Sequence, residues 1–116
     1  MCGLIGGFGK DASFIHEEIL RSSGALMSYR GPDATNFFQN DNKNFSVLHH
    51  RLGIVGLNSN FDQPFQKNSS VLAFNGEIYN FRDRSTQYTS DTDFLSDEFS
   101  ALGSKCLEKL VGMYAG

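Results

Sequence analysis

Short apolar runs separated by polar and glycine-rich stretches predict a strand-rich first half of the chain. Residues 4–8 are expected to form a strand, and the glycines around it indicate backbone that bends or lies close to another group. Residues 35–39 and 45–50 predict two more strands. The polar run 40–43 between them is typical of a turn.

A period-two pattern indicates that the strand over 45–50 continues further along the chain. The apolar positions of this continuation are Leu52, Ile54 and Leu57. Residues 71–74 predict a further strand, which runs into Asn75-Gly76. That dipeptide can mark a hairpin turn.

The first segment with helical spacing covers residues 14–29. A cap is expected among residues 11–13, and the helix is expected to end before Pro32, which disfavours helical geometry in the residue ahead of it. The expected buried stripe consists of Ile15, Ile19 and Leu26.

The second predicted helix begins at Ser90, and residues 90–93 resemble a capping box with a shorter acid. Its end is expected at Gly103. The expected buried stripe consists of Leu95, Phe99 and Leu102. A short amphipathic turn over 105–110 follows.

Composition narrows the class of protein. The 116 residues suffice for one domain or part of one, and the eleven Phe suit a sheet-based core. With a net charge of −3 and no basic cluster, nucleic-acid binding is not expected. No apolar run is long enough for a membrane span. The two cysteines, Cys2 and Cys106, are too few for a disulfide framework, so a cytoplasmic setting is expected.

Cys2 is the first residue that indicates chemistry. Aminopeptidases remove an initiator Met when the next side chain is small, which would leave one residue with both a thiol and a free α-amine. The amine has a reference pKa of about 7.7–8.0 and can accept the thiol proton near neutrality. This is the nucleophile-plus-terminal-amine arrangement of covalent catalysis. Taken alone, Met-Cys-Gly is a weak signal, because a free cysteine is more commonly a small buried hydrophobe.

Cys2 is accompanied by four more short blocks in a fixed order. The five blocks are Met-Cys-Gly-Leu-Ile-Gly at 1–6, Arg-Gly-Pro-Asp at 30–33, His-His-Arg-Leu-Gly-Ile-Val at 49–55, Phe-Asn-Gly-Glu-Ile-Tyr-Asn at 74–80 and Ser-Asp-Thr-Asp at 90–93. Together they resemble the glutaminase domain of the asparagine synthetase B family. That family belongs to the class II glutamine amidotransferases, within the N-terminal-nucleophile hydrolases.

The resemblance implies an α+β fold, the αββα sandwich of the N-terminal-nucleophile hydrolases, with residues 1–116 as the N-terminal part of the amidotransferase domain. It also implies catalytic roles. Cys2 would be the nucleophile, and the side chain of Asn75 and the backbone N–H of Gly76 would form the oxyanion hole. Loss of one such donor typically costs on the order of 3 kcal/mol in the barrier.

The resemblance implies a glutamine site as well. Arg51 would hold the α-carboxylate, for which the guanidinium fork is well shaped, and Asp91 would receive the α-ammonium. The residues expected to line the two ends of the site are Leu52, Gly53, Ile54 and Val55 beside Arg51, and Asn75, Gly76 and Glu77 beside Asp91. Neither a metal nor an organic cofactor is required.

Each of these residues also has a purely structural interpretation. Arg51 could be a surface arginine on an edge strand, Asp91 could cap a helix, and Asn75-Gly76 could be only a turn. Residues expected to be structural are Arg30 and Asp33 in the loop over the site, His49 as a partly buried histidine, His16 and His50 in solvent, and Cys106 in a core.

The sequence also departs from the family pattern. Tyr29 replaces a usual His, and Gly53 and Gly56 replace residues that are usually Ser or Ala and Asp. Residues 81–89 are too few for a full helix plus a connection. The family's later strands and the synthetase nucleotide loop do not occur in this sequence. A sandwich truncated at its C-terminal side is therefore expected, in which another chain completes the domain, the sequence is a fragment, or the fold is reduced.

Two functions of different classes follow. The first is hydrolysis of glutamine to glutamate and ammonia by Cys2, with ammonia supplied to an asparagine-synthetase-like partner or a missing C-terminal domain. The second is a non-catalytic relative that binds glutamine or a protein. A truncated fragment without an independent role is a third possibility, and an oligomer is compatible with the first.

Overall fold

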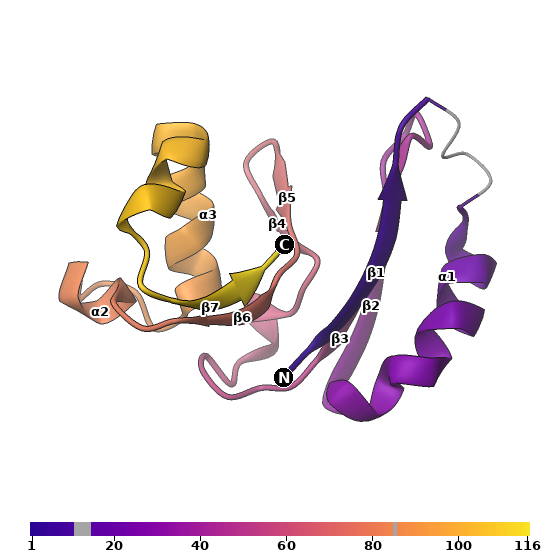
Figure 1. Ribbon diagram of the computed structural model, residues 1–116, viewed down its shortest axis with the longest axis horizontal. Coiled ribbons are helices and arrows are strands. Elements are labelled where there is room, and N and C mark those ends of the chain that lie inside the picture. Colours follow the sequence, from indigo (N-terminus) through magenta and orange to yellow (C-terminus); the bar gives the residue numbers. More distant parts are fainter. Residues whose placement is uncertain (11–14, 85) are drawn as a thin grey trace.

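A three-stranded antiparallel sheet forms the first part of the molecule. The computed structural model describes residues 1–10, 15–84 and 86–116. The sheet has the order β1-β3-β2, with β1 at Gly3–Phe8, β2 at Ala34–Gln39 and β3 at Phe45–Arg51 (Figure 1). All three strands and the turn between β2 and β3 confirm the sequence prediction to within one residue.

The register of this sheet brings distant segments to one end of it. Gly3 pairs with His50 in β3, and Ala34 of β2 pairs with Arg51. The N-terminus therefore lies next to the residues that follow β3. The predicted continuation of β3 through residue 57 is wrong, because the strand ends at Arg51 and the chain turns away into a loop.

Helix α1 (Glu17–Gly24) covers one face of this sheet, and a 3₁₀ helix, η2 (Ala25–Arg30), continues it (Figure 1). The predicted single helix from residue 14 is wrong at its start, because His16 occupies the N-cap position. The predicted cap among residues 11–13 lies outside the described residues. The structure thus has an α-helix followed by a 3₁₀ helix where a single α-helix was expected.

The predicted apolar stripe of the first helix is also wrong. Ile19 is 44% exposed and Leu26 83% exposed, whereas Leu20 and Gly24 are buried. A Cβ on Gly24 would lie 2.4 Å from a methyl carbon of Leu48, so this glycine allows the helix to lie close against β3. The helix packs through its smallest residue, which a search for large apolar side chains does not find.

The second part of the molecule contains two antiparallel pairs of strands and the second long helix (Figure 1). Its elements are η3 (Ser59–Phe61), β4 (Phe65–Lys67), β5 (Ser70–Leu72), β6 (Asn75–Ile78), α2 (Phe81–Arg84), α3 (Asp91–Leu102), η4 (Gly103–Lys109) and β7 (Gly112–Ala115). Strand β4 pairs with β5, and β6 pairs with β7, both antiparallel. The single turn of α2 agrees with the short space expected there.

The predicted hairpin turn at Asn75-Gly76 is wrong. Both residues lie in β6 and pair with β7. The hairpin occurs earlier, between β4 and β5, where Asn68 adopts a positive φ of 55°. The predicted strand over 71–74 ends at Leu72. Strands β4 and β7 were not predicted, since three or four residues are too few to show alternation.

The core of the second part forms between α3 and β6. Its buried members are Phe74, Ile78, Phe81, Phe94, Leu95 and Cys106. Cys106 is thus a core residue, as predicted. Of the stripe expected on α3, Leu95 is buried, but Phe99 and Leu102 are 46% and 39% exposed. Phe94 takes the place expected of Phe99.

The start of α3 confirms the predicted cap. The Ser90 hydroxyl accepts a hydrogen bond from the Thr92 N–H at 3.1 Å, which satisfies one of the free donors of the first turn. Asp93 does not complete a capping box, because its carboxylate pairs with Lys67 at 2.7 Å. Gly103 ends the helix with a φ of 57°.

These elements make a small mixed α and β domain. None of the helices in the described ranges combines the length and apolar character that crossing a membrane requires.

Candidate active site

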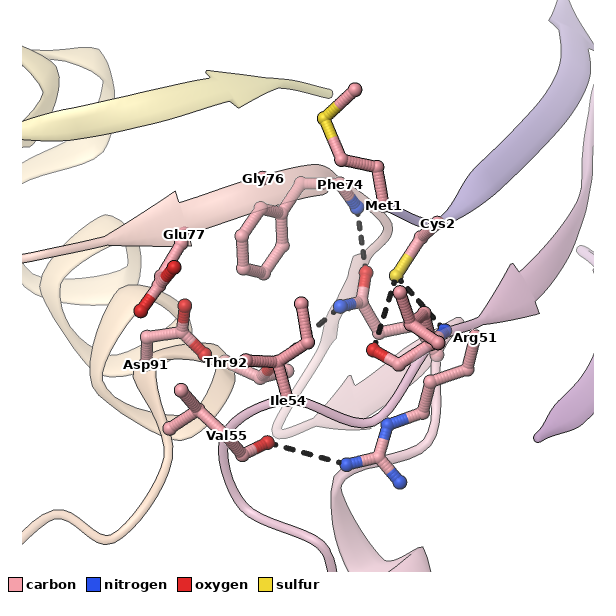
Figure 2. Close-up of a pocket in the computed structure, with 12 residues that line it drawn as sticks. Met1, Cys2, Arg51, Ile54, Val55, Phe74, Gly76, Glu77, Asp91 and Thr92 are labelled. Carbon is pink, nitrogen blue, oxygen red and sulfur yellow. Dashed lines mark hydrogen bonds between the residues drawn. The ribbon is translucent and has the colours of Figure 1, made fainter. Parts of the chain in front are cut away.

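A pocket lies where the end of the three-stranded sheet meets β6 and the first turn of α3 (Figure 2). Its lining residues are Met1, Cys2, Arg51, Leu52, Ile54, Val55, Gln63, Phe74, Gly76, Glu77, Asp91 and Thr92. The cavity has a volume of about 40 Å³ with Met1 in place, which is room for water rather than for an amino acid. Five segments that are distant in sequence converge here.

The Cys2 thiol is held by the backbone that follows β3. The Leu52 N–H donates to Sγ at 3.3 Å, and Sγ lies 3.7 Å from the Leu52 carbonyl oxygen (Figure 2). Arg30 donates from Nε to the Cys2 carbonyl oxygen at 3.1 Å. The half-buried thiol is free. Its position is therefore fixed by the pairing of β1 with β3 and by one arginine.

Asn75 and Gly76 begin β6 on the opposite wall. Gly76 lines the pocket, whereas Asn75 lines an adjoining cavity together with Cys2. Oδ1 of Asn75 is buried and has no hydrogen-bond partner among the described residues. Gly76 has a φ of 153°, and a Cβ there would lie 2.0 Å from the Met113 carbonyl oxygen. Only glycine fits at this point of the β6–β7 pair.

Arg51 is 7% exposed and lies on the central strand, so the interpretation as a surface arginine on an edge strand is wrong. Its Nη1 donates to Asp62 at 2.6 Å and to the Asn58 carbonyl at 3.4 Å. Its Nη2 donates to the carbonyls of Val55, at 3.4 Å, and of Gly56. The guanidinium thus shapes the loop after β3 with its terminal nitrogens.

Asp91 joins β6 to α3. It is 6% exposed, and its Oδ2 accepts the Ile78 N–H at 3.1 Å. Burial raises the pKa of this carboxyl above its usual value, and the nearby charge of Glu77 acts in the same direction. Backbone N–H groups, including that of Ile78, oppose the rise. Ser90 rather than Asp91 occupies the N-cap position, so Asp91 is not simply a cap.

Most of the other predicted lining residues reach the pocket. Leu52, Ile54, Val55 and Glu77 line it. Gly53 is not among the lining residues, and its N–H donates to the Asp33 carboxylate at 2.7 Å.

Arg30 and Asp33 therefore have the supporting role predicted for them. Arg30 binds the backbone of Cys2, and Asp33 binds the loop after β3.

Two of the three histidines, His49 and His50, are more buried than predicted. His49 is fully buried, and its Nε2 donates to the Phe74 carbonyl at 3.2 Å. Burial lowers the pKa of His49, although the bond to Phe74 opposes this. His50, predicted to be solvated, is 4% exposed; its Nδ1 bonds Thr35 at 2.8 Å and its Nε2 bonds the Gly24 carbonyl at 3.0 Å. Both are buried because β3 is covered on both faces; His16 is exposed as predicted.

Two residues of the site were missed from the sequence. Asp62 is the ion-pair partner of Arg51, and Gln63 is 5% exposed in the pocket wall. They lie in an irregular loop just before Pro64, where no periodic pattern marks a buried position. Only the burial of polar residues in the folded chain reveals them.

Comparisons with known proteins agree with the order of the sequence blocks. A family model described as a glutamine amidotransferase domain matches residues 1–116. The glutamine-hydrolyzing asparagine synthetase B of Escherichia coli K12 is 32% identical over 126 residues, which cover 99% of this chain and 22% of that protein. A putative glutamine-hydrolyzing asparagine synthetase 2 of Methanocaldococcus jannaschii is 30% identical over 141 residues, covering 99% and 27%.

A relative of a different name also matches. The amidase chry2 of Gibberella zeae is 32% identical over 106 residues, which cover 90% of this chain and 15% of that protein. The chain thus spans between 15% and 27% of the length of these three relatives.

Proposed function

Because this chain belongs to the glutamine amidotransferase domain family, we propose that it hydrolyses glutamine to glutamate and ammonia with Cys2 as the nucleophile. The observation that carries the proposal is the convergence of Cys2, Gly76 and Asp91 on one pocket from three separate elements. A thiol, a backbone donor and a buried carboxylate are the groups that attack on the amide of an amino acid requires.

The proposed reaction starts after removal of Met1, which frees the α-amine of Cys2 and opens the pocket wall that Met1 forms. The amine takes the thiol proton, and sulfur attacks the amide carbon of glutamine. The amine then returns a proton to the leaving nitrogen, so ammonia departs and a thioester remains. Water, deprotonated by the same amine, attacks the thioester and releases glutamate and the thiol.

Asn75 and Gly76 are suited to stabilise the oxyanion of both steps. The Gly76 backbone is held by pairing with β7, and Asn75 lines the cavity next to Cys2. Donors fixed before the reaction need no reorganisation as charge develops on the oxygen.

Free glutamine is a zwitterion, and the pocket has a charged group at each end. Asp91 would bind the α-ammonium, since an anion beside a cation offsets the cost of its burial. Arg51 supplies positive charge for the α-carboxylate, with Nε as the donor, since Nη1 and Nη2 already bind protein oxygens. Its bonds to the carbonyls of Val55 and Gly56 also shape the loop that would cover this end.

We further propose that the two parts of the molecule belong to an αββα sandwich and that residues 1–116 form part of the amidotransferase domain. An apolar cavity of about 580 Å³ lies between the first sheet and β5 with α3. Its apolar lining includes Leu4, Phe8, Phe45, Val47, Val71, Leu72 and Phe99. A space of this kind between two layers is where a sandwich has its core.

The ammonia would be consumed by an asparagine-synthetase-like partner or region, because two of the relatives named above are glutamine-hydrolyzing asparagine synthetases. A reducing compartment such as the cytoplasm suits a reaction that needs Cys2 as a free thiol.

The test is the rate of ammonia release from glutamine by the wild type and by Cys2→Ala, with intact masses that show Met1 removed from both. The wild type should release ammonia and Cys2→Ala should not exceed the buffer rate. A variant with one residue added before Cys2, which keeps the thiol but lacks its α-amine, should be as inactive as Cys2→Ala. Equal rates for the wild type and Cys2→Ala would exclude catalysis, and a glutamine-induced thermal shift in that case would indicate a binding protein.

A further inference from the structure

Gln63 is a buried amide between the two walls of the pocket. It lies in the loop between η3 and β4 and is 5% exposed. Amide side chains are seldom buried without a reason, because each donor and acceptor that loses water must find another partner. The partners of Gln63 therefore indicate its role.

The two ends of this amide bind different elements. Oε1 accepts the Phe74 backbone N–H at 2.6 Å, directly before Asn75 (Figure 2). Nε2 donates to the Thr92 hydroxyl at 3.4 Å, directly after Asp91. A single side chain thus connects the residue ahead of the proposed oxyanion hole to the residue behind the proposed ammonium site.

The Phe74 residue is held from a second direction as well. Its carbonyl oxygen accepts from Nε2 of His49 at 3.2 Å. Both polar groups of this residue are therefore bound by buried side chains, one from β3 and one from the loop. Since Phe74 is not part of a strand, these two bonds fix the point at which β6 begins.

The residue before Gln63, Asp62, binds the arginine proposed to hold the α-carboxylate. Asp62 pairs with Arg51 at 2.6 Å. Asp62 thus binds Arg51 directly, and Gln63 binds the neighbours of Asn75 and Asp91. These three residues are the ones proposed to bind glutamine or the oxyanion.

From these contacts we propose that Gln63 is a positioning residue of the glutamine site, which sets the spacing between the Asn75-Gly76 donors and Asp91. The proposal rests on the proposed function, since the spacing is relevant only if both groups bind one substrate. An amide suits both partners, because its oxygen accepts the Phe74 N–H and its nitrogen donates to the Thr92 hydroxyl.

The test compares Gln63→Leu with Gln66→Leu, both made in the chain that has lost Met1. Gln66 lies on β4, three residues further on, and is exposed, so it controls for the chemical change. Gln63→Leu removes the acceptor for a buried N–H, and kcat for glutamine should fall about tenfold. That is less than the hundredfold or greater loss typical when an oxyanion donor itself is removed. Gln66→Leu should leave kcat and KM unchanged.

Gln63→Glu separates positioning from the mere filling of space. Its carboxylate still accepts the Phe74 N–H, and the Thr92 hydroxyl can donate to it. This variant should recover at least half of the loss in kcat seen in Gln63→Leu, if that loss comes from the hydrogen bonds. If Gln63→Leu does not fold, Thr92→Val serves in its place, with an expected threefold rise in KM, because that contact adjoins Asp91.

Amide hydrogen exchange distinguishes failure of this proposal from failure of the proposed function. Exchange at Phe74, Asn75 and Thr92 should be at least tenfold faster in Gln63→Leu than in the wild type, and unchanged in Gln66→Leu. An inactive wild type with this pattern would refute glutamine hydrolysis but retain Gln63 as the link between the two walls. Unchanged exchange and unchanged kcat in a folded Gln63→Leu would overturn the positioning role, whether or not the wild type is active.

Discussion

At the scale of single residues, the site gathers polar groups that a stable core would avoid. Asp91 is buried with a raised pKa, and Asn75 keeps a buried oxygen without a partner among the described residues. Such groups reduce the free energy of unfolding unless a ligand binds them. Asp91 lines the pocket that contains Cys2, and Asn75 lines the cavity that adjoins it, which is a reason to assign both to substrate rather than to the fold.

Asp91→Asn should therefore make the unliganded protein more stable at pH 7 while it weakens glutamine binding. In the window above the usual Asp pKa of 3.8 and up to the raised one, the folded state holds more protons than the unfolded state. The free energy of unfolding of the wild type thus falls as pH rises through this window. Asparagine does not ionise, so the variant does not lose stability as pH rises, and its side-chain oxygen still accepts the Ile78 N–H.

Urea unfolding at pH 7 measures the gain in stability, and KM for glutamine should rise at least tenfold, as expected for loss of a charged hydrogen bond worth about 1.5–3 kcal/mol. A variant that is less stable than the wild type and binds glutamine equally well would show that Asp91 is structural.

His49 should make the protein sensitive to acid. Its pKa is lowered by burial, so below the reference value of 6.5 the unfolded state binds a proton that the folded state does not. The free energy of unfolding is therefore lost as pH falls from about 6.5 through the lowered pKa, with a slope of up to about 1.4 kcal/mol per pH unit.

Urea midpoints at pH 7.5, 6.5 and 5.5 should show this slope in the wild type and a shallower one in His49→Gln. His16→Gln, a change at an exposed histidine, is the matched control and should follow the wild type. A slope that His49→Gln leaves unaltered would assign the acid sensitivity to other groups.

That Cys2 and most of the other pocket-lining residues come together could be predicted from sequence at this scale, because each belongs to a compact block of residues. The burial of His50 could not be predicted. Histidine is a polar residue and is expected in solvent unless both faces of its strand are known to be covered. Asp62 and Gln63 carried no signal either, because their importance comes from partners 11 residues away or more.

At the scale of elements, the site depends on β6 starting at Asn75 and pairing with β7. The sequence predicted a turn there because Asn-Gly is the strongest hairpin signal in short segments. Pairing with a strand more than thirty positions later overrides that local preference. Caps were predicted better, as at Ser90, because a cap is decided by its immediate neighbours.

Gly76→Ala should separate β6 from β7. The new Cβ would lie 2.0 Å from the Met113 carbonyl oxygen, so the backbone must move. We expect a loss of about 2–4 kcal/mol in the free energy of unfolding and loss of activity. Gly103→Ala is the matched control, since Gly103 also has a positive φ but, within the part of the chain that the structure describes, no atom other than those of its chain neighbours lies within 4 Å of the new Cβ.

Gly103→Ala should cost only about 1–2 kcal/mol, the conformational part of the change. Thermal unfolding and denaturant titration of both variants measure the difference. Equal losses would mean that the positive φ, and not the closeness of β7, is what requires glycine at position 76.

At the scale of the whole molecule, the site lies at the junction of the two parts. The loop after β3 belongs to the first part and touches the start of α3 in the second. A Cβ on Gly56 would lie 2.8 Å from Cβ of Ser90 and 3.0 Å from the Phe61 ring. No local pattern predicts such a contact, because it depends on how the two parts of the molecule meet.

Gly56→Ala should therefore disturb the junction and the glutamine site together, with a lower Tm and a higher KM. Gly53→Ala in the same loop is the control for stability: its Cβ would have ordinary contacts, the nearest at 3.5 Å from Asp33. Differential scanning fluorimetry with and without glutamine reports both effects. A Gly56→Ala protein with the Tm of Gly53→Ala would show that the junction tolerates the added methyl group.

The account depends most directly on Cys2 as the reactive group of a glutamine site. The decisive measurement is peptide-mapped mass spectrometry after incubation with a glutamine analogue that carries a diazoketone in place of the amide. In protein without Met1, we predict one stable thioether on Cys2, none on the buried Cys106, and protection by excess glutamine. An unlabelled Cys2, or equal labelling when a residue is added before it, would contradict the account.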